Sequence, residues 1–169
     1  LAEEDDKFIT LKIENGVLYV DTAGAGFEES WNEMLESREN AGEARLVVRL
    51  MDKLLASGIN PRCMALLTPY VAQSKLLKTL VKIPGLEIGS VDGFQGREKE
   101  LVIVSLVRSN MEGEMGFLTD TRRMNVAMTR ARRKLIVIGD SATLSSIKFY
   151  EDFMKYAETH GIYKSAWEL

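Results

Sequence analysis

The sequence predicts an α/β protein with a mainly parallel β-sheet and helices on both faces. Two short apolar runs, Leu101–Ser105 and Leu135–Ile138, are rich in β-branched residues and are bounded by polar or turn residues. Such runs are typical of strands that are buried on both faces. Segments with helical apolar spacing alternate with runs of this kind, which favours parallel strands joined by helices. In such sheets, ligands usually meet the loops that follow the carboxyl ends of the strands.

The amino-terminal part of the chain is predicted to begin with a β-hairpin. Phe8–Ile13 alternates apolar and polar residues, Val17–Val20 is apolar, and Asn15-Gly16 stands between these two segments. Asn-Gly between two such runs is a strong hairpin signal. A loop of small residues follows at 21–26, and the acidic stretch 27–40 is predicted to be a loop with a helical turn.

The remainder of the chain alternates predicted helices and strands. Apolar residues at helical spacing predict helices over 44–56, over 71–81, from a cap at Asp120 or Thr121 to about Arg132, and over 141–156. Short apolar runs predict strands at 64–67, 86–91, 101–105 and 135–138. The polar, glycine-bearing segment 108–116 is predicted to be a loop.

Length, cysteine content and hydropathy limit the class of protein. A chain of 169 residues is long enough for one domain with a full core. The only cysteine, Cys63, allows no internal disulfide and fits a reducing intracellular setting, cytoplasmic or nuclear. No apolar run approaches the roughly 20 residues that cross a bilayer, so no membrane partner is expected. The acidic start without an initiator Met suggests a fragment of a longer protein.

Charge is distributed unevenly along the chain. The net charge is −3, but residues 1–43 carry −9 and the remainder carries +6. Residues 121–134 alone contain six basic residues and no acidic residue. The acidic composition argues against a nucleic-acid partner, whereas this local basic cluster keeps such a partner possible.

The basic cluster falls on a predicted helix. Met124, Ala127, Met128 and Ala131 lie at helical spacing and are expected to form its buried stripe. The arginines around that stripe repel one another unless an anion or nearby acids neutralise them. Since arginine donates paired hydrogen bonds and stays charged, the cluster predicts contact with phosphate.

A second candidate site is the segment Gly96-Arg97-Glu98. Glycine allows close backbone approach, and the Glu98 carboxylate can accept hydrogen bonds from a sugar hydroxyl. An ordinary surface turn is the alternative interpretation. The chain contains no G-x-x-x-x-G-K-[S/T] phosphate loop, so it is expected to supply only one side of any nucleotide site. Metal-ligand spacing is not found, and the only histidine, His160, lies near the carboxyl terminus.

Three segments in order resemble motifs IV, V and VI of the second RecA-like domain of superfamily 1B helicases. The resemblance points to the branch that contains the nonsense-mediated-decay RNA helicase and the immunoglobulin mu-binding helicase. The matching segments are Leu67–Gln73 for motif IV, Ser90–Glu100 for motif V and Asn125–Arg132 for motif VI. Residues 17–160 are covered, which implies a RecA-like sheet of the P-loop NTPase type without its own P-loop.

The resemblance implies a site for ATP at the boundary with another domain. In this family, ATP and Mg²⁺ lie between two RecA-like domains, and the first domain carries the P-loop and holds the metal. By motif position, Arg130 is the expected arginine finger, Glu98 the ribose ligand and Gly96 a backbone contact to the phosphates. An arginine finger stabilises the charge on the transferred phosphoryl group.

The resemblance also implies a groove for single-stranded RNA or DNA, shared with the missing first domain. The positions carried over for this contact are Thr68, Pro69, Tyr70, Ser90 and Val91. Hydroxyls, backbone amides and an aromatic ring suit phosphate contact and base stacking without sequence readout. For Tyr70, packing against its own domain is an equally good interpretation.

The expected organisation has an amino-terminal extension or hairpin strand at 1–16, a RecA-like domain at 17–160 and a tail at 161–169. The expected function is that of the carboxyl-terminal RecA-like half of an ATP-dependent 5′-to-3′ helicase, inactive without its partner domain. A RecA-like module that binds nucleic acid or protein without catalysis is the alternative.

Overall fold

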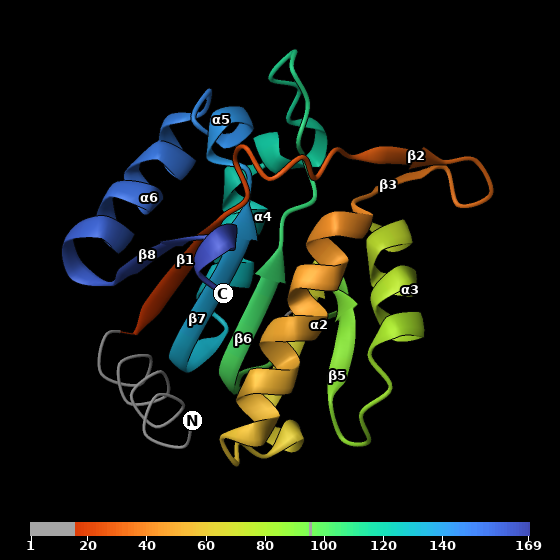
Figure 1. Cartoon of the computed structure of the whole chain (residues 1–169), viewed down its shortest axis with the longest axis vertical. Coiled ribbons are helices and arrows are strands. Elements are labelled where there is room, and N and C mark those ends of the chain that lie inside the picture. Colours follow the sequence, from red (N-terminus) through yellow and green to blue (C-terminus); the bar gives the residue numbers. More distant parts are fainter. Residues whose placement is uncertain (1–15, 95) are drawn as a thin grey trace.

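The computed structural model describes residues 16–94 and 96–169, drawn in colour in Figure 1. The first strand of the predicted hairpin, Phe8–Ile13, lies outside the described residues. Val17–Asp21, at the other side of Asn15-Gly16, forms strand β1. Within the described part of the chain, no helix is long and apolar enough to pass through a membrane.

A six-stranded parallel sheet forms the centre of the described chain, with strand order β5-β4-β6-β7-β1-β8 (Figure 1). Its strands are β1 Val17–Asp21, β4 Met64–Thr68, β5 Glu87–Ser90, β6 Lys99–Ser105, β7 Ala131–Gly139 and β8 Ile162–Ser165. The predicted α/β class with a mainly parallel sheet is therefore confirmed, and its arrangement is that of a RecA-like domain.

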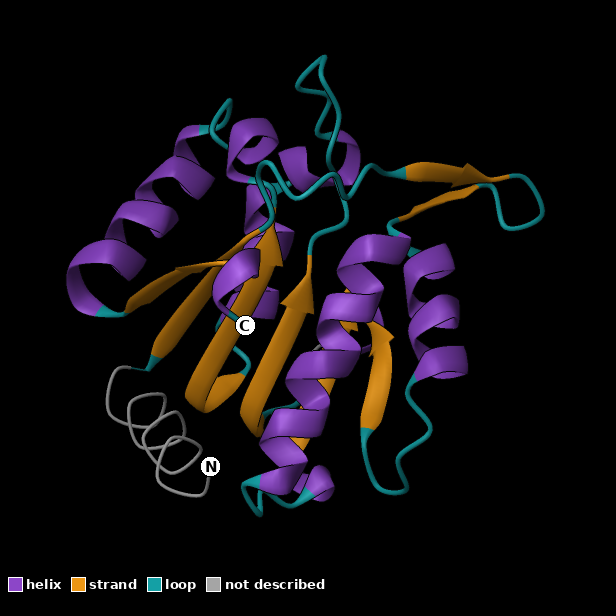
Figure 2. Cartoon of the chain, in the orientation of Figure 1, coloured by secondary structure: helices purple, strands orange, loops and turns teal. Residues whose placement is uncertain are grey.

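Helices cover both faces of the sheet, as Figure 2 shows. Their bounds are α2 Ala41–Ala56, α3 Val71–Leu80, α4 Thr121–Met128, α5 Ser141–Leu144 and α6 Lys148–His160, with short 3₁₀ helices η1 Pro61–Cys63, η2 Asp92–Phe94, η3 Gly116–Thr119 and η4 Ala166–Glu168. Alternate residues of each buried strand enter two separate clusters. One cluster packs the sheet against α2 and α3, and the other packs it against η2, α4 and α6.

The acidic stretch 27–40 differs from the predicted loop with a helical turn. It forms an antiparallel pair, β2 Ser30–Asn32 and β3 Ser37–Glu39, which extends from the body of the domain in Figure 1. Trp31 lies opposite Arg38 in this pair, and the Arg38 guanidinium stands 5.2 Å from the centre of the Trp31 ring. A cross-strand cation–π contact of this kind stabilises a short hairpin, and charge alone did not indicate it.

The predicted helix from 120 to about Arg132 is too long. Helix α4 ends at Met128, and Ala131 already begins β7. The Lys99 amide donates a 3.1 Å hydrogen bond to the Arg130 carbonyl, and Lys99 pairs with Ala131 in the sheet. Pairing with β6 therefore replaces the last helical turn. Met124, Ala127 and Met128 are buried as predicted, whereas Ala131 belongs to a strand.

Two further segments near the carboxyl terminus depart from expectation. The single predicted helix over 141–156 is divided into α5 and α6, because Ile147 adopts an extended conformation between them. The segment 161–169, expected to be a tail, contains β8, which pairs with β1 and adds a strand to the sheet.

The Asn40 side chain joins the amino end of α2 to two neighbouring segments. It accepts from the Glu43 amide at 2.9 Å, which caps the helix, and donates to the carbonyls of Phe27 and Val107 at 2.7 and 3.0 Å. Asn40→Ala should lower the free energy of unfolding by about 2–4 kcal/mol, since it removes a cap and leaves buried carbonyls unpaired. Denaturant unfolding measures this loss.

Asn60→Ala is the matched control. Asn60 caps η1 by accepting from the Arg62 amide at 3.0 Å, but it is exposed and makes no second contact of this type within the described chain. Its removal should cost about 1 kcal/mol or less. Equal losses for the two variants would contradict a special role for Asn40.

Candidate functional site at the two edges of the sheet

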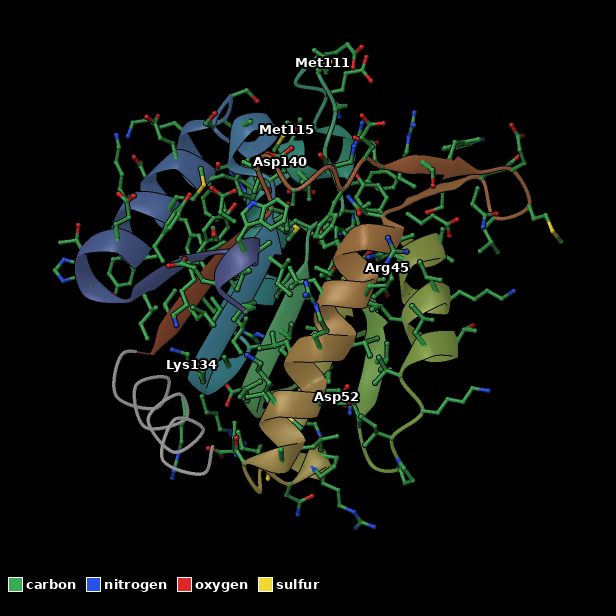
Figure 3. All side chains as sticks on the ribbon, viewed as in Figure 1. Arg45, Asp52, Met111, Met115, Lys134 and Asp140 are labelled. Carbon is green, nitrogen blue, oxygen red and sulfur yellow. The ribbon has the colours of Figure 1, made fainter. Side chains whose placement is uncertain are left out.

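The structure separates the expected nucleotide and nucleic-acid residues onto opposite edges of the sheet. Gly96 and Glu98 precede the amino end of β6, and Arg130 precedes the amino end of β7. Thr68 and Ser90 end β4 and β5 at the carboxyl edge. The expected nucleotide residues therefore lie at the amino ends of strands and not at the carboxyl ends, where ligands usually meet such sheets. Figure 3 labels landmarks of both edges: Met115 and Asp140 lie near the carboxyl ends of the strands, and Lys134 lies towards the amino ends.

At the amino edge, the backbone brings Arg130 beside the segment that contains Glu98. The hydrogen bond from the Lys99 amide to the Arg130 carbonyl joins the two chain segments at 3.1 Å. The Arg130 Nε donates to the Val126 carbonyl at 3.1 Å, and Nη2 lies 3.5 Å from the Thr129 hydroxyl. Within the described residues, Arg130 forms no ion pair. Its terminal nitrogens are thus held weakly and can donate to an anion.

Glu98 at the same edge has a different partner from the one the resemblance implies. Its carboxylate accepts from the Arg132 Nε at 3.1 Å, and the Glu98 side chain is about half exposed. Hydrogen bonds from Arg132 to Glu98 and Glu100 raise the pKa of the Arg132 guanidinium. Any ribose hydroxyl that binds Glu98 must compete with this exposed ion pair, which is weak because water screens it.

Gly96 has the backbone freedom that close approach of a ligand requires. Its φ is +73°, a conformation that residues with a Cβ atom rarely adopt. A Cβ atom added there meets no other atom within 4 Å, so the space beside this glycine is open. The backbone of Gly96 is exposed at the amino edge and accessible to a ligand.

The basic residues of 121–134 do not act as one cluster. Arg123 forms a bidentate ion pair with Asp92, in which Nε lies 2.6 Å from one carboxylate oxygen. Arg133 forms an ion pair with Glu100 at 2.9 Å. Acids from the segment 92–100 therefore neutralise these arginines, although the local sequence contains no acid. Lys134 is buried, and burial lowers its pKa to about 8. Arg130 differs from Arg123 and Arg133 because its partners are neutral oxygens.

At the carboxyl edge, most of the expected nucleic-acid residues are buried. Thr68 and Pro69 are buried, Val91 is 4% exposed, and the Val91 amide donates to the Thr68 carbonyl at 3.1 Å. The Ser90 side chain is partly exposed and accepts from the Gly93 amide at 3.1 Å. These residues therefore shape the edge, while only part of their surface is open to a ligand.

Tyr70 packs against its own domain. It is 3% exposed, its hydroxyl accepts from the Arg108 guanidinium at 3.2 Å, and its ring lies 5.4 Å from that of Phe117. Burial raises the pKa of the Tyr70 hydroxyl. Packing, which was the alternative interpretation of this residue, is what the structure shows. The exposed aromatic rings beside it are those of Phe117 and Trp31.

Sequence reasoning missed the ion pair that organises this edge. The Arg108 Nε lies 3.1 and 3.0 Å from the two carboxylate oxygens of Glu29, and both side chains are almost fully buried. The pair joins the loop after β6 to the segment before β2. Since 79 residues separate the two partners, the local sequence pattern carries no signal that links them.

A buried polar network lies beneath the carboxyl edge. The Glu43 carboxylate accepts from the Ser105 hydroxyl at 2.6 Å and from the Val107 amide at 3.0 Å, and the Gln73 amide donates to the Ser105 hydroxyl at 3.1 Å. Val107 has φ +73°, an uncommon conformation for a β-branched residue. The network therefore holds a strained turn at the point where β6 leads into the loop that carries Arg108.

Burial raises the pKa of Glu43 from 4.5 to about 7, and hydrogen bonds from Ser105 and Val107 oppose that shift. The unfolded chain loses this proton near pH 4.5 and the folded chain near pH 7, so the charge on Glu43 destabilises the fold as pH rises through this window. Glu43→Gln should remove the effect. Relative to the variant, the wild type should lose about 3 kcal/mol of unfolding free energy between pH 4.5 and pH 8.

Denaturant unfolding of both proteins across this pH range measures the difference. Glu33→Gln is the control, because it removes an exposed charge from the β2–β3 hairpin without touching the network. Parallel pH curves for wild type and Glu43→Gln would show that the buried carboxyl does not titrate in this window.

No group of three or more His, Cys, Asp or Glu side chains within residues 16–94 and 96–169 is arranged to hold a metal ion. The carboxylates nearest to the expected nucleotide residues, Glu98 and Glu100, are held by arginines. The amino edge of the described chain therefore presents the Arg130 guanidinium and the open backbone of Gly96, while its carboxylates are paired with arginines.

Comparison with known proteins identifies a family model that matches most of the chain. A family model described as an AAA domain matches residues 3–142. The mouse DNA-binding protein SMUBP-2 is 46% identical over 154 residues, which cover 90% of this chain and 16% of the mouse protein. DNA polymerase alpha-associated DNA helicase A of Schizosaccharomyces pombe is 39% identical over 178 residues, which cover 95% and 27% of the two proteins.

A third relative is the regulator of nonsense transcripts 1 homolog of Drosophila melanogaster, 36% identical over 126 residues that cover 69% of this chain and 11% of the fly protein. Since the AAA-domain model matches most of the chain, the chain belongs to that family and is a RecA-like domain of the superfamily 1 helicase type. It spans only about a quarter or less of the length of these three relatives.

Proposed function

We propose that the chain is the second, carboxyl-terminal RecA-like domain of an ATP-driven nucleic-acid helicase. The observation that supports this most directly is the position of Arg130, which has no carboxylate partner within the described residues and is fixed beside the Gly96–Glu98 segment by the backbone of Lys99. An arginine placed in this way can reach a phosphate that another domain holds. The nucleotide itself is expected to be bound by a separate P-loop domain.

In this proposal, each group at the amino edge has a separate part. The Arg130 guanidinium donates to the terminal phosphate and stabilises the charge that spreads over its equatorial oxygens. Glu98 exchanges Arg132 for the ribose hydroxyls, and the Gly96 backbone lies against the phosphates. ATP is bound with Mg²⁺, and the first domain supplies the ligands of the metal.

The carboxyl edge is proposed to contact single-stranded RNA or DNA. Thr68, Pro69, Tyr70, Ser90 and Val91 shape this edge, and Ser90 is the most exposed of these residues. The names of the mouse and fission-yeast relatives mention DNA binding and a DNA helicase, which supports nucleic acid as the partner. Movement in the 5′-to-3′ direction follows from the resemblance to superfamily 1B alone.

Arg130→Ala in the complete helicase tests the finger. Without the guanidinium, the charge of the transition state loses a partner, so ATP turnover should fall about 10³-fold or more while nucleotide affinity stays within a few-fold. Steady-state ATPase kinetics and equilibrium nucleotide binding separate the two effects. Arg133→Ala removes another arginine from the same edge and should leave turnover almost unchanged.

Near-normal turnover in Arg130→Ala would remove the finger assignment. Absence of ATPase activity in the wild-type complete protein would favour the second candidate, a RecA-like module that binds nucleic acid or protein without catalysis.

Glu98→Ala tests the ribose contact. If the carboxylate binds the ribose in both the ground state and the transition state, its loss should raise the apparent KM for ATP with little change in kcat. Glu100→Ala is the matched control, because Glu100 also pairs with Arg132 but follows Glu98 by two residues. The same KM in all three proteins would contradict the assignment.

A further inference from the structure

A pocket at the carboxyl edge is lined by aromatic rings from segments far apart in the sequence. Its walls include Trp31 of the β2–β3 hairpin, Tyr70 before α3 and Phe117 of η3, and its volume is about 290 Å³. Trp31 is 47% and Phe117 is 56% exposed, whereas Tyr70 is buried. The pocket is therefore lined by two half-exposed rings and by the buried ring of Tyr70.

Each exposed ring of the pocket is supported by a cation. The Arg38 guanidinium stands 5.2 Å from the centre of the Trp31 ring, and the Arg123 guanidinium stands 5.6 Å from that of Phe117. Both arginines are in turn paired with carboxylates, Arg38 with Glu29 and Arg123 with Asp92. The rings are thereby held in place before any ligand arrives, which lowers the cost of ordering them on binding.

The backbone at Gly116 is also adapted to this arrangement. Gly116 has φ +52°, and a Cβ atom there would collide with the Arg108 guanidinium and approach the Tyr70 hydroxyl to 3.0 Å. A larger residue would displace Arg108 and with it the support of Tyr70. Glycine at this position therefore lets η3 approach Tyr70 closely and brings Phe117 to the pocket.

The electrostatics of the pocket suit a neutral flat ring better than a phosphate. Arg108 and Arg38 line the pocket, but both are already paired with Glu29. Glu36 adds another acid to the lining. A phosphate would meet neutralised arginines and a carboxylate, whereas a nucleobase presents a π-face that stacks on aromatic rings whatever its sequence.

We infer that this pocket holds a nucleobase of the single strand, stacked on Trp31 and Phe117. The inference rests on the proposed function, because it takes the strand to run along the edge formed by Thr68, Tyr70 and Ser90. It adds a base contact to an edge whose expected residues are mostly buried. The hairpin then acts as a clamp that holds one base while the rest of the strand is contacted through its backbone.

Trp31→Ala in the complete helicase tests this contact. Equilibrium binding without ATP is measured for a labelled oligodeoxythymidine and for an oligonucleotide of the same length in which abasic sugars replace all nucleosides. Loss of one stacking contact should weaken binding of the normal strand about 5- to 100-fold. The affinity for the abasic strand should stay unchanged, and Trp31→Phe should restore most of the loss.

Trp167→Ala is the matched control, because Trp167 is 75% exposed in η4 and does not line the pocket. Equal affinities of wild type and Trp31→Ala for the normal strand, or equal losses on both strands, would overturn the inference and leave the helicase proposal intact. A wild-type protein that binds neither strand would instead overturn the proposed function, and the pocket assignment with it.

Discussion

Pairing between the amino ends of β6 and β7 is the constraint on which the proposed nucleotide edge depends. Helix α4 ends at Met128, and the bond from the Lys99 amide to the Arg130 carbonyl lets β7 begin at Ala131, four residues before the strand that the sequence predicts. Because of this change, the Arg130 backbone lies beside the segment that contains Glu98, while its Nε donates to the Val126 carbonyl at the end of α4.

The two edges of the sheet are joined by two chain segments that cross the same face. Residues 91–94 follow the carboxyl end of β5, residues 96–98 precede the amino end of β6, and α4 runs from the carboxyl edge towards Arg130. The bidentate ion pair of Arg123 with Asp92 connects these segments to each other. The two edges are therefore connected both by the covalent chain and by an ion pair across one face of the sheet.

The carboxyl edge depends on polar groups that the protein buries at a cost. Glu43 has its pKa raised by burial, and Val107 has positive φ, yet both are held in one network with Asn40 and Ser105. The presence of this network under the Arg108 loop fits a structure in which the position of that loop matters more than stability, as is common for functional sites.

By itself, the sequence determined the α/β class, the buried strands and most helix positions, because apolar periodicity and caps are local properties. The motif segments also pointed to the helicase type that the family comparison supports. The tertiary structure alone decided where α4 ends, that 27–40 forms a hairpin, and which arginines are neutralised. These features depend on partners distant in the sequence, such as Lys99 for Arg130 and Glu29 for Arg108, and a local pattern contains no information about such partners.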